Sequence, residues 1–379
     1  MAGEKIIEVL IGDALTKLKE LPNESVQCVV TSPPYWGLRD YGVDGQLGLE
    51  KTPEEYVRHL VEVFRELKRV LRDDGTVWLN LGDSYASDSK GTGGPSEKQL
   101  SNAGSRYDAI HLQHGLKSKD LVGIPWRVAF ALQADGWYLR SDIIWSKPNP
   151  MPESVTDRPT KSHEYIFLLT KSPRYFYDQE AIREPHETPL HSPGNLINTG
   201  VGERARTHPA NEPDRQWGTS SGRNKRSVWT MNTKPYAEAH FATFPPELPE
   251  TCIKAGTSQK GCCPKCGAPW ERVVKRDSHC GVERGTQPSQ FRANLKPPQQ
   301  SSVSVSVKTI GWQPTCECGE ATTVPCVVMD PFAGSGTTGE VARNLGRRAV
   351  LIELNPEYLK LINARTMAQV QDITGCMGR

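Results

Sequence analysis

A glycine-rich stretch near the end of the chain carries residues suited to holding a small cofactor. The apolar run Val327–Met329 is typical of a buried strand, and Asp330 ends it. The turn that follows contains three glycines, Gly334, Gly336 and Gly339. A strand, a glycine turn and a helix form the unit with which α/β proteins bind nucleotide-like cofactors. Glu353 ends the next apolar run, 23 residues after Asp330, where a carboxylate suits hydrogen bonds to ribose hydroxyls.

Asp330 decides between classes of cofactor. A dinucleotide would place its pyrophosphate on this turn, at a helix N-terminus that favours anions, and a carboxylate at the strand end would repel it. S-adenosylmethionine carries no phosphate, and its methionine end has an ammonium group that a carboxylate attracts. A P-loop is excluded because no lysine follows the glycines. The residues therefore favour S-adenosylmethionine, with a glycine turn of purely structural role as the alternative.

A second motif, Thr31-Ser32-Pro33-Pro34-Tyr35, follows the apolar run Val26–Val30. Together, Ser32–Tyr35 and Asp330–Thr338 resemble the two hallmark motifs of the DNA amino-methyltransferases, which modify exocyclic nitrogens of cytosine or adenine. The motif with Ser32 comes first, as in the circularly permuted beta group of that family. The resemblance covers most of the chain apart from three insertions. It implies a Rossmann-like α/β methyltransferase fold, circularly permuted, with a mostly parallel sheet and helices on both faces.

The resemblance also implies which residues contact the cofactor. Asp13 would lie beside the cofactor adenine and accept a hydrogen bond from its amine, although an aspartate at this position could instead be an N-cap. Phe244 and Pro245 would lie nearest the methionine end. The full set of expected cofactor-binding residues is Asp13, Phe244, Pro245, Asp330, Phe332, Gly334, Ser335, Gly336, Thr337 and Glu353.

The resemblance assigns catalysis to Ser32, Pro33, Pro34 and Tyr35. The enzyme must extrude the target nucleotide from the duplex, and Tyr35 offers an aromatic face for stacking the flipped base. Two prolines lock the backbone, so that the Ser32 hydroxyl and the Pro33 carbonyl can both accept hydrogens from the amine. By the resemblance Trp145 is expected to help enclose the base, with a buried core residue as the alternative. Family members with serine at the first motif position are mostly cytosine-N4 enzymes, so we favour cytosine N4 over adenine N6.

Two further interpretations compete with this one. Cytosine-C5 methylation uses a Pro-Cys nucleophile, and Pro325-Cys326 occurs here. That pair precedes the cofactor strand, however, at the wrong end to reach a base, and it would leave Ser32–Tyr35 unexplained. A DNA-binding module with a degenerate methyltransferase core is the other alternative, and the intact motifs argue against it.

Cysteines mark an insertion at 259–323. Cys263-Pro264-Lys265-Cys266-Gly267 is a zinc-knuckle sequence, and Cys316 and Cys318 are its natural partners. Four thiolates would form a closed structural zinc site, with Cys262 as an alternative to Cys263. The second pair is C-x-C, and 49 residues separate the two pairs, which departs from common zinc ribbons. Free surface thiols are the alternative.

Charge and composition limit the kinds of partner that the protein can have. The net charge of +2 gives no global field for nucleic acid, so attraction to DNA must come from local patches. In the segment 179–234, periodicity vanishes and basic residues gather among Pro, Gly and His. The resemblance places target recognition there, and Arg223, Lys225 and Arg226 are the expected DNA contacts; a solvated linker is the alternative. No leader or membrane span is visible, so we expect a cytoplasmic protein that acts on double-stranded DNA, with a homodimer and a cognate restriction endonuclease left open.

The elements that must position these residues follow from periodicity. Strands are expected at 6–11, 26–30, 76–81, 137–145, 164–170 and 349–352, and helices at 14–21, 53–72, 125–134, 248–255 and 338–345. Asp73-Asp74-Gly75 is expected to end the second helix, and 276–300 to be unstructured. The predicted organisation is a catalytic half at 1–178 with a loop at 84–119, a recognition region at 179–235, a cofactor half at 236–258 and 324–379, and the insertion at 259–323.

Overall fold

The computed structural model describes residues 6–38, 40–86, 116–185, 222–234, 244–281 and 302–366, with only the backbone at 277–281 and 302–306. The chain divides into two compact units. The first comprises Met1–Asp178, Arg226–Glu271 and Pro314–Arg379, and the second comprises Gln179–Lys225 and Arg272–Gln313. Among the described residues, no helix combines the length and the apolar character needed to cross a membrane.

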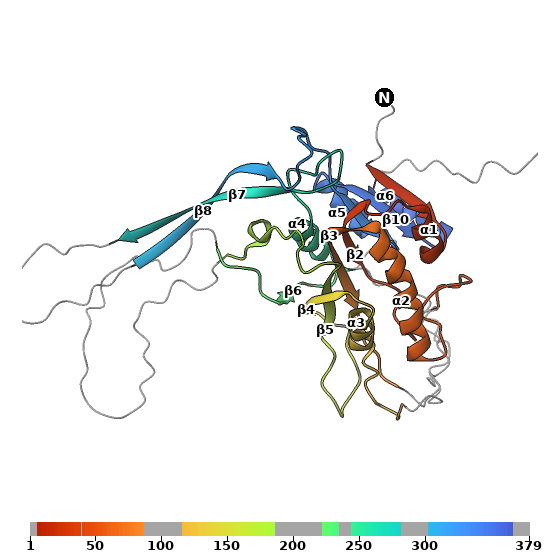
Figure 1. Cartoon of the computed structure of the whole chain (residues 1–379). Coiled ribbons are helices and arrows are strands. Elements are labelled where there is room, and N and C mark those ends of the chain that lie inside the picture. The colour runs from red at the N-terminus through yellow and green to blue at the C-terminus, as the bar shows by residue number, and fades with distance from the viewer. Residues whose placement is uncertain are drawn as a thin grey trace, which may run out of the picture. The chain divides into compact units, whose positions relative to one another are not determined.

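The first unit is built on an eight-stranded sheet (Figure 1). In spatial order its strands are β1 (Ile7–Ile11), β10 (Arg348–Glu353), β9 (Val327–Asp330), β2 (Val26–Thr31), β3 (Leu71–Leu81), β5 (His163–Thr170), β4 (Tyr138–Ser146) and β6 (Val228–Thr230). All neighbours are parallel except where β5 pairs with β3 and β4. The expected mostly parallel sheet is therefore confirmed. Its strand directions bring the ends of β9, β2, β3 and β4 and the beginning of β5 to one edge.

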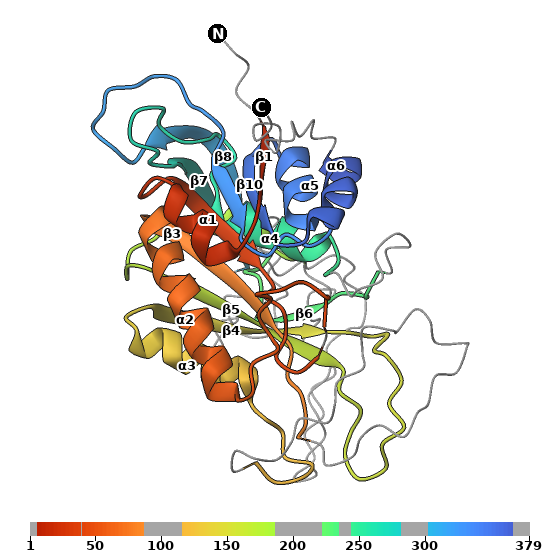
Figure 2. The ribbon, with the colours of Figure 1, turned by 90° about the vertical axis from the view of Figure 1, so that its right-hand side faces the viewer.

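Helices cover both faces of this sheet (Figure 2). On one face α1 (Ala14–Glu20), α2 (Pro53–Val70) and α3 (Ile124–Ala134) share a core with the strand residues Val29, Val77 and Leu79. On the other face α4 (Glu247–Gly256) packs so closely that a Cβ on Gly256 would lie 2.4 Å from Thr76 Oγ1. There α4 contacts α5 (Thr337–Asn344), which contacts α6 (Leu359–Thr366).

Local sequence signals explain the helix boundaries. Thr52 caps α2, because its hydroxyl accepts a hydrogen bond from the Glu55 amide (3.0 Å), and Pro53 opens the first turn. The expected stop at Asp73-Asp74-Gly75 is wrong, because α2 already ends at Val70 and the three residues lie inside β3. The Leu71 amide donates the last hydrogen bond of the helix to the Leu67 carbonyl. Leu71 itself pairs with Val26 of β2.

Two other departures concern short or irregular segments. The strand β6 lies in the segment where periodicity vanishes, and it pairs with β4 at the edge of the main sheet. Three residues are too few to show alternation. In the second unit, η2 (Gln179–Ile182) is a single 3-10 turn, while β7 (Trp270–Gly281) and β8 (Ser302–Pro314) form a two-stranded sheet. Residues 276–281 are thus strand and not unstructured, and 282–300 lie outside the described residues, as does most of the predicted loop at 84–119.

Candidate active site

The two motifs meet at the edge where β2 and β9 end. Asp330 is 1% exposed, and its carboxylate accepts hydrogen bonds from Thr31 Oγ1 (2.7 Å), Thr338 Oγ1 (2.8 Å) and the Phe332 amide (3.1 Å). Thr31 immediately precedes Ser32, so one hydrogen bond joins the cofactor motif to the catalytic motif across 299 residues of chain. Ligands of open α/β sheets bind outside such carboxyl ends.

The acidic pair at this edge, Asp330 and Glu353, has raised pKa values. Burial raises the pKa of Asp330 to about 6, against the three hydrogen bonds that lower it. Burial also raises the pKa of Glu353 to about 7, and the Asp330 charge adds to this shift. None of the main causes of the two shifts is a neighbouring cation. A positively charged ligand would therefore be attracted here and would lower both pKa values.

The glycine turn and Glu353 form one hydrogen-bonded unit. The Gly334 amide donates to Glu353 Oε2 (2.7 Å), while Glu353 Oε1 accepts from the Asn355 amide (2.8 Å). Gly336 has φ +82° and precedes α5, and a Cβ there would lie 3.3 Å from the backbone of Ile362. The turn thus requires glycine at 336 both for its conformation and for the close approach of α6.

The other expected cofactor residues have varied surroundings. The hydroxyls of Ser335 and Thr337 accept hydrogen bonds from Arg365 of α6 (2.6 and 2.7 Å). Asp13 is exposed and caps α1 by accepting from the Thr16 amide (2.9 Å), which is the structural role left open for it. Pro245 is buried just before α4, next to the half-buried Phe244. Contact of these residues with a cofactor stays a prediction.

The catalytic motif is the start of a polar network. Ser32 Oγ donates to Tyr35 Oη (3.3 Å), which donates to Glu164 Oε2 (2.7 Å). Asn80 Nδ2 donates to the same carboxylate oxygen (3.1 Å), and Lys147 Nζ forms an ion pair with Glu164 Oε1. These side chains come from the ends of β2, β3 and β4 and the beginning of β5. The network therefore lies at the edge that the strand order selects.

Packing fixes the motif in place. A Cβ on Gly82 would lie 2.5 Å from the Tyr35 ring, so this position tolerates only glycine without displacement of the ring. The Tyr56 hydroxyl donates to the Pro34 carbonyl (2.8 Å) and holds the backbone from the side of α2. Trp145 is 3% exposed and donates through Nε1 to the Met231 carbonyl (2.9 Å), so it is a core residue of β4.

Sequence reasoning missed Asn80, Lys147, Glu164 and Arg365. Asn80 left a signal, because it is a polar residue within the buried run Val77–Leu81, and Glu164 left a weaker one, as an acidic residue directly before the run Tyr165–Leu169. Lys147 left none, since its partner depends on the register of β4 against β5, which pairs Trp145 with Glu164. Cys326 lies before β9, at the end away from the network, as the argument against C5 methylation requires.

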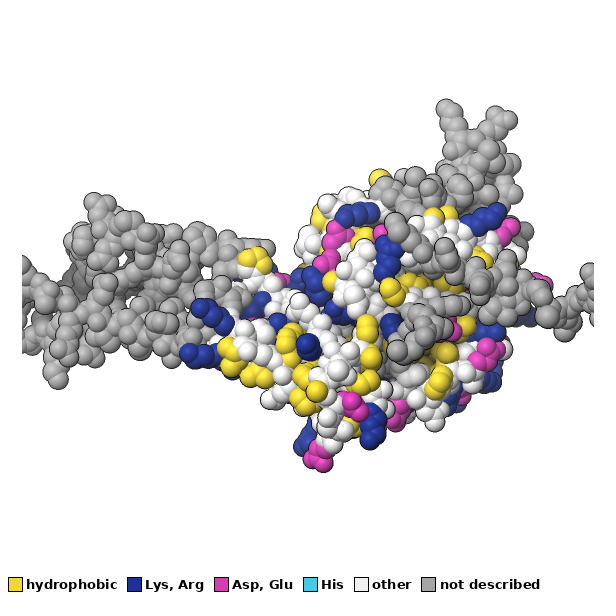
Figure 3. All heavy atoms as spheres, turned by 90° about the horizontal axis from the view of Figure 1, so that it is seen from above, with side chains coloured by type: hydrophobic (Ala, Val, Ile, Leu, Met, Phe, Trp, Pro, Cys, Tyr) yellow, Lys and Arg dark blue, Asp and Glu magenta, His cyan; other side chains and the backbone are white. Residues whose placement is uncertain are grey.

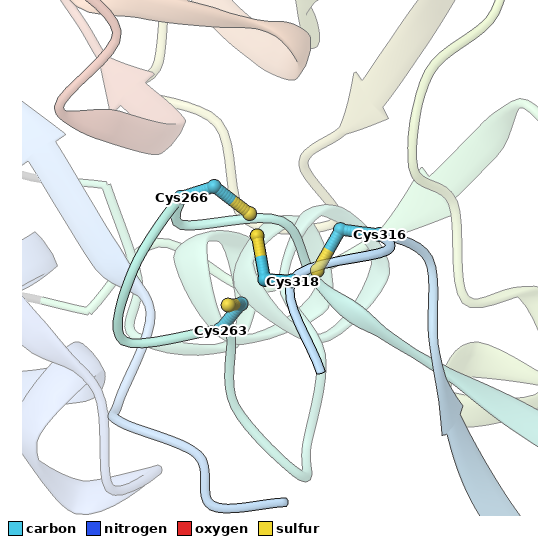
Figure 4. Close-up of side chains that lie close together, drawn as sticks. All are labelled: Cys263, Cys266, Cys316 and Cys318. Atoms are coloured by element: carbon cyan, nitrogen blue, oxygen red, sulfur yellow. The ribbon is translucent and has the colours of Figure 1, made fainter. Parts of the chain in front are cut away.

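The four cysteines of the expected zinc site come together (Figure 4). The Sγ atoms of Cys263, Cys266, Cys316 and Cys318 all lie within 4.8 Å of one another. The knuckle is closed by the Gly267 amide, which donates to the Cys263 carbonyl (2.8 Å), and Gly267 has φ +72°. The alternative ligand Cys262 is not part of this cluster, because its thiol donates to the Val324 carbonyl (3.5 Å).

The expected DNA contacts Arg223 and Lys225 share one acidic partner. Arg223 Nε lies 3.2 Å from Glu184 Oε2, and Lys225 Nζ lies 3.7 Å from Glu184 Oε1. Arg226 belongs to the first unit. On the face shown in Figure 3, the coloured Lys and Arg side chains are scattered among acidic and hydrophobic ones.

Comparison with known proteins finds similarity to DNA methyltransferases. The family model for DNA methylases matches residues 26–263 and 321–364. Type II methyltransferase M.XycI of Xanthomonas campestris pv. cyanopsidis is 43% identical over 362 residues, which cover 96% of this chain and 88% of that protein. M.SmaI of Serratia marcescens is 39% identical, with 95% and 90% covered. The solved PvuII DNA methyltransferase, described as cytosine-N4-specific, superposes with a TM-score of 0.53 at 17% identity, covering 97% of this chain and 91% of that one.

The sheet order and the meeting of two motifs at one edge define a Rossmann-like, S-adenosylmethionine-dependent methyltransferase fold, as the sequence predicts. The chain belongs to the N6/N4 DNA methylase family.

Proposed function

We propose that the chain transfers the methyl group of S-adenosylmethionine to the exocyclic N4 of a cytosine flipped out of duplex DNA. The observation that carries this proposal is the hydrogen bond between Thr31 and Asp330, which puts the catalytic motif beside the cofactor motif. The buried Asp330 carboxylate, whose pKa burial raises to about 6, suits the positively charged methionine end of this cofactor. The relatives named type II methyltransferases support site-specific action and, with it, a cognate restriction endonuclease and a cytoplasmic location.

The choice of cytosine N4 over adenine N6 rests on Ser32. Nucleoside mass spectrometry of duplex DNA treated with the chain and cofactor tests this choice. We expect N4-methylcytosine. Detection of N6-methyladenine instead would mean that the same mechanism acts on the exocyclic amine of adenine. The absence of both, together with no cofactor binding in calorimetry, would favour a degenerate DNA-binding core.

We further infer that Cys263, Cys266, Cys316 and Cys318 hold one structural zinc ion. Tetrahedral zinc with Zn–S distances of about 2.3 Å separates its sulfurs by about 3.8 Å, which the cluster allows. Four thiolates fill the coordination sphere and leave no position for a substrate. The knuckle contacts the core, because the Gly267 carbonyl accepts from Gln27 Nε2 (3.2 Å) and Gln27 Oε1 accepts from the Val327 amide (2.6 Å). Zinc would therefore stabilise the start of β9.

Elemental analysis should find about one zinc per chain in protein purified without chelator. Cys316→Ser should lose the metal and lower the thermal midpoint, because binding free energy of a structural ion is folding free energy. The control Cys262→Ala should keep the metal. Metal-free wild type, or full zinc content in Cys316→Ser, would contradict the site.

We also propose that Arg223, Lys225 and Arg226 face DNA phosphates. Arg223 and Lys225 both pair with Glu184, so any phosphate contact of these two cations competes with that carboxylate. Replacing all three by Ala should make the slope of log K against log salt shallower by roughly 2, with equal losses for specific and non-specific duplexes. The control Glu184→Gln should make the slope steeper. A loss of affinity confined to the cognate duplex would mean that these residues contact bases. No change in affinity or in salt dependence would mean that the segment is a linker.

A further inference from the structure

The hydrogen bonds of Tyr35 run from Ser32 to Tyr35 and from Tyr35 to Glu164, with Asn80 Oδ1 (3.3 Å) as a second and longer acceptor for the phenol. Ser32 Oγ donates to Tyr35 Oη (3.3 Å), and Tyr35 Oη donates to Glu164 Oε2 (2.7 Å). Burial, reinforced by the Glu164 charge, raises the pKa of Tyr35 well above its ordinary value, so the phenol keeps its proton. Because the Ser32 hydrogen points towards Tyr35, the lone pairs of Ser32 Oγ remain for a hydrogen of the target amine.

Glu164 is the final acceptor in this series of hydrogen bonds. Asn80 Nδ2 donates to its Oε2 (3.1 Å), and Asn80 is anchored through a second hydrogen bond to the Tyr165 carbonyl (3.1 Å). Lys147 Nζ pairs with Oε1 and also lies 4.3 Å from the Trp145 ring centroid. The side chains of Glu164 and Lys147 are 15% and 17% exposed. Both side chains are therefore partly accessible to water.

Methyl transfer to an exocyclic amine must release a proton. The nitrogen lone pair forms a bond to the methyl carbon, the C–S bond breaks, and its electrons turn the sulfonium into a neutral thioether. The nitrogen is left with a positive charge and loses it as a proton. Relay of that proton away from the base completes the step and prevents its reversal at the nitrogen.

We propose that Glu164 receives this proton through Ser32 and Tyr35, an inference that rests on the proposed methyl transfer. The amine gives a proton to Ser32 Oγ, Ser32 gives its own to Tyr35, and Tyr35 gives its own to Glu164. Ser32 and Tyr35 end unchanged, while Glu164 ends as a carboxylic acid and returns the proton to water between turnovers. The hydrogen bond of 3.3 Å would tighten when substrate binds, as catalytic hydrogen bonds commonly do. Glu164 touches no substrate and acts as a positioning residue and proton acceptor.

Two substitutions of Glu164 separate proton acceptance from structure. Glu164→Gln keeps the length and can accept from Tyr35, but it cannot take the proton at neutral pH. Glu164→Asp keeps the carboxylate on a shorter side chain. At saturating cofactor and DNA, the single-turnover rate of Glu164→Gln should fall about 100-fold or more, and Glu164→Asp should be at least about tenfold faster than Glu164→Gln. Dissociation constants for cofactor and DNA should stay within about twofold of the wild type. If Glu164 has only a structural role, the single-turnover rate of Glu164→Gln should exceed that of Glu164→Asp, and this order would overturn the proposal.

A double-mutant cycle tests the continuity of the relay. Tyr35→Phe removes the connecting hydroxyl and keeps the ring, so combining it with Glu164→Gln should cost no more than the larger single loss. Losses that multiply would overturn the relay. The controls Glu153→Gln, which breaks a pair with Arg158, and Tyr138→Phe, on the exposed side of β4, should keep the wild-type rate. If the wild type methylates DNA and Glu164→Gln is equally fast, the relay alone is rejected. If the wild type does not methylate DNA, the proposed function is rejected as well.

Discussion

Replacing Ser32 by Ala should lower the single-turnover rate of methyl transfer by about 10²–10⁴-fold while cofactor binding stays unchanged. The Ser32 hydroxyl is the group in the network with lone pairs directed away from Tyr35, and its loss removes the acceptor for the amine hydrogen. Cofactor binding is spared because Asp330 accepts its hydrogen bonds from Thr31, Thr338 and the Phe332 amide rather than from Ser32.

Rapid-quench measurement of labelled methyl transfer, with calorimetry for the cofactor, checks both parts of the expectation. The matched control is Ser25→Ala, whose hydroxyl donates to the Pro22 carbonyl (2.8 Å) on an exposed turn. If Ser32→Ala transfers methyl groups as fast as Ser25→Ala, then Ser32–Tyr35 is not the catalytic motif.

Replacing Asp330 by Asn should weaken cofactor binding by about 1.5–3 kcal/mol, or about 10–150-fold, the range for a hydrogen bond to a charged group. Calorimetric titration measures the loss, with Asp135→Asn, which breaks a surface pair with Arg65, as the control. Affinity within about twofold of the wild type would remove Asp330 from the cofactor site.

The same substitution should stabilise the cofactor-free protein. The folded-state pKa of Asp330 rises from 3.8 to about 6, so the folded state holds the proton more tightly than the unfolded state. The resulting penalty is absent well below pH 3.8, grows as pH rises from 3.8 to about 6 and levels off above it at up to about 3 kcal/mol. Asp330→Asn should therefore raise the free energy of unfolding at pH 8 and lose most of this advantage at pH 4, as measured by denaturant titration. A loss of stability at pH 8 would mean that the hydrogen bonds to Thr31 and Thr338 outweigh the burial of charge.

The sequence allowed prediction of the sheet, the two motifs and the cysteine cluster because each is written in local patterns. Apolar runs mark β2 and β9, a capping box marks α2, and a knuckle marks Cys263 and Cys266. The fate of Asp73-Asp74-Gly75 was not predictable, since these residues lie at an irregularity of β3, between the pairing of Leu71 with Val26 and that of Thr76 with Cys28. The contact between Glu164 and Lys147 in the active site could not be predicted for the same reason, because it depends on the pairing of β4 with β5.

The recognition region differs for another reason. Charge density alone cannot show that two cations share a carboxylate, as Arg223 and Lys225 share Glu184. Nor could composition show that the segment ends in a strand of the main sheet, because β6 is only three residues long. Tertiary pairing, and not local preference, decides both features.

Methylation-sensitive single-molecule sequencing of host DNA tests the central claim most directly, because it reports the modified base and its sequence context together. Cells expressing the wild-type chain should carry N4-methylcytosine at one short recurring sequence, and cells expressing Ser32→Ala should carry none. Unmodified DNA from wild-type cells that contain folded, cofactor-binding protein would contradict the account. So would methylation that persists in the Ser32→Ala cells.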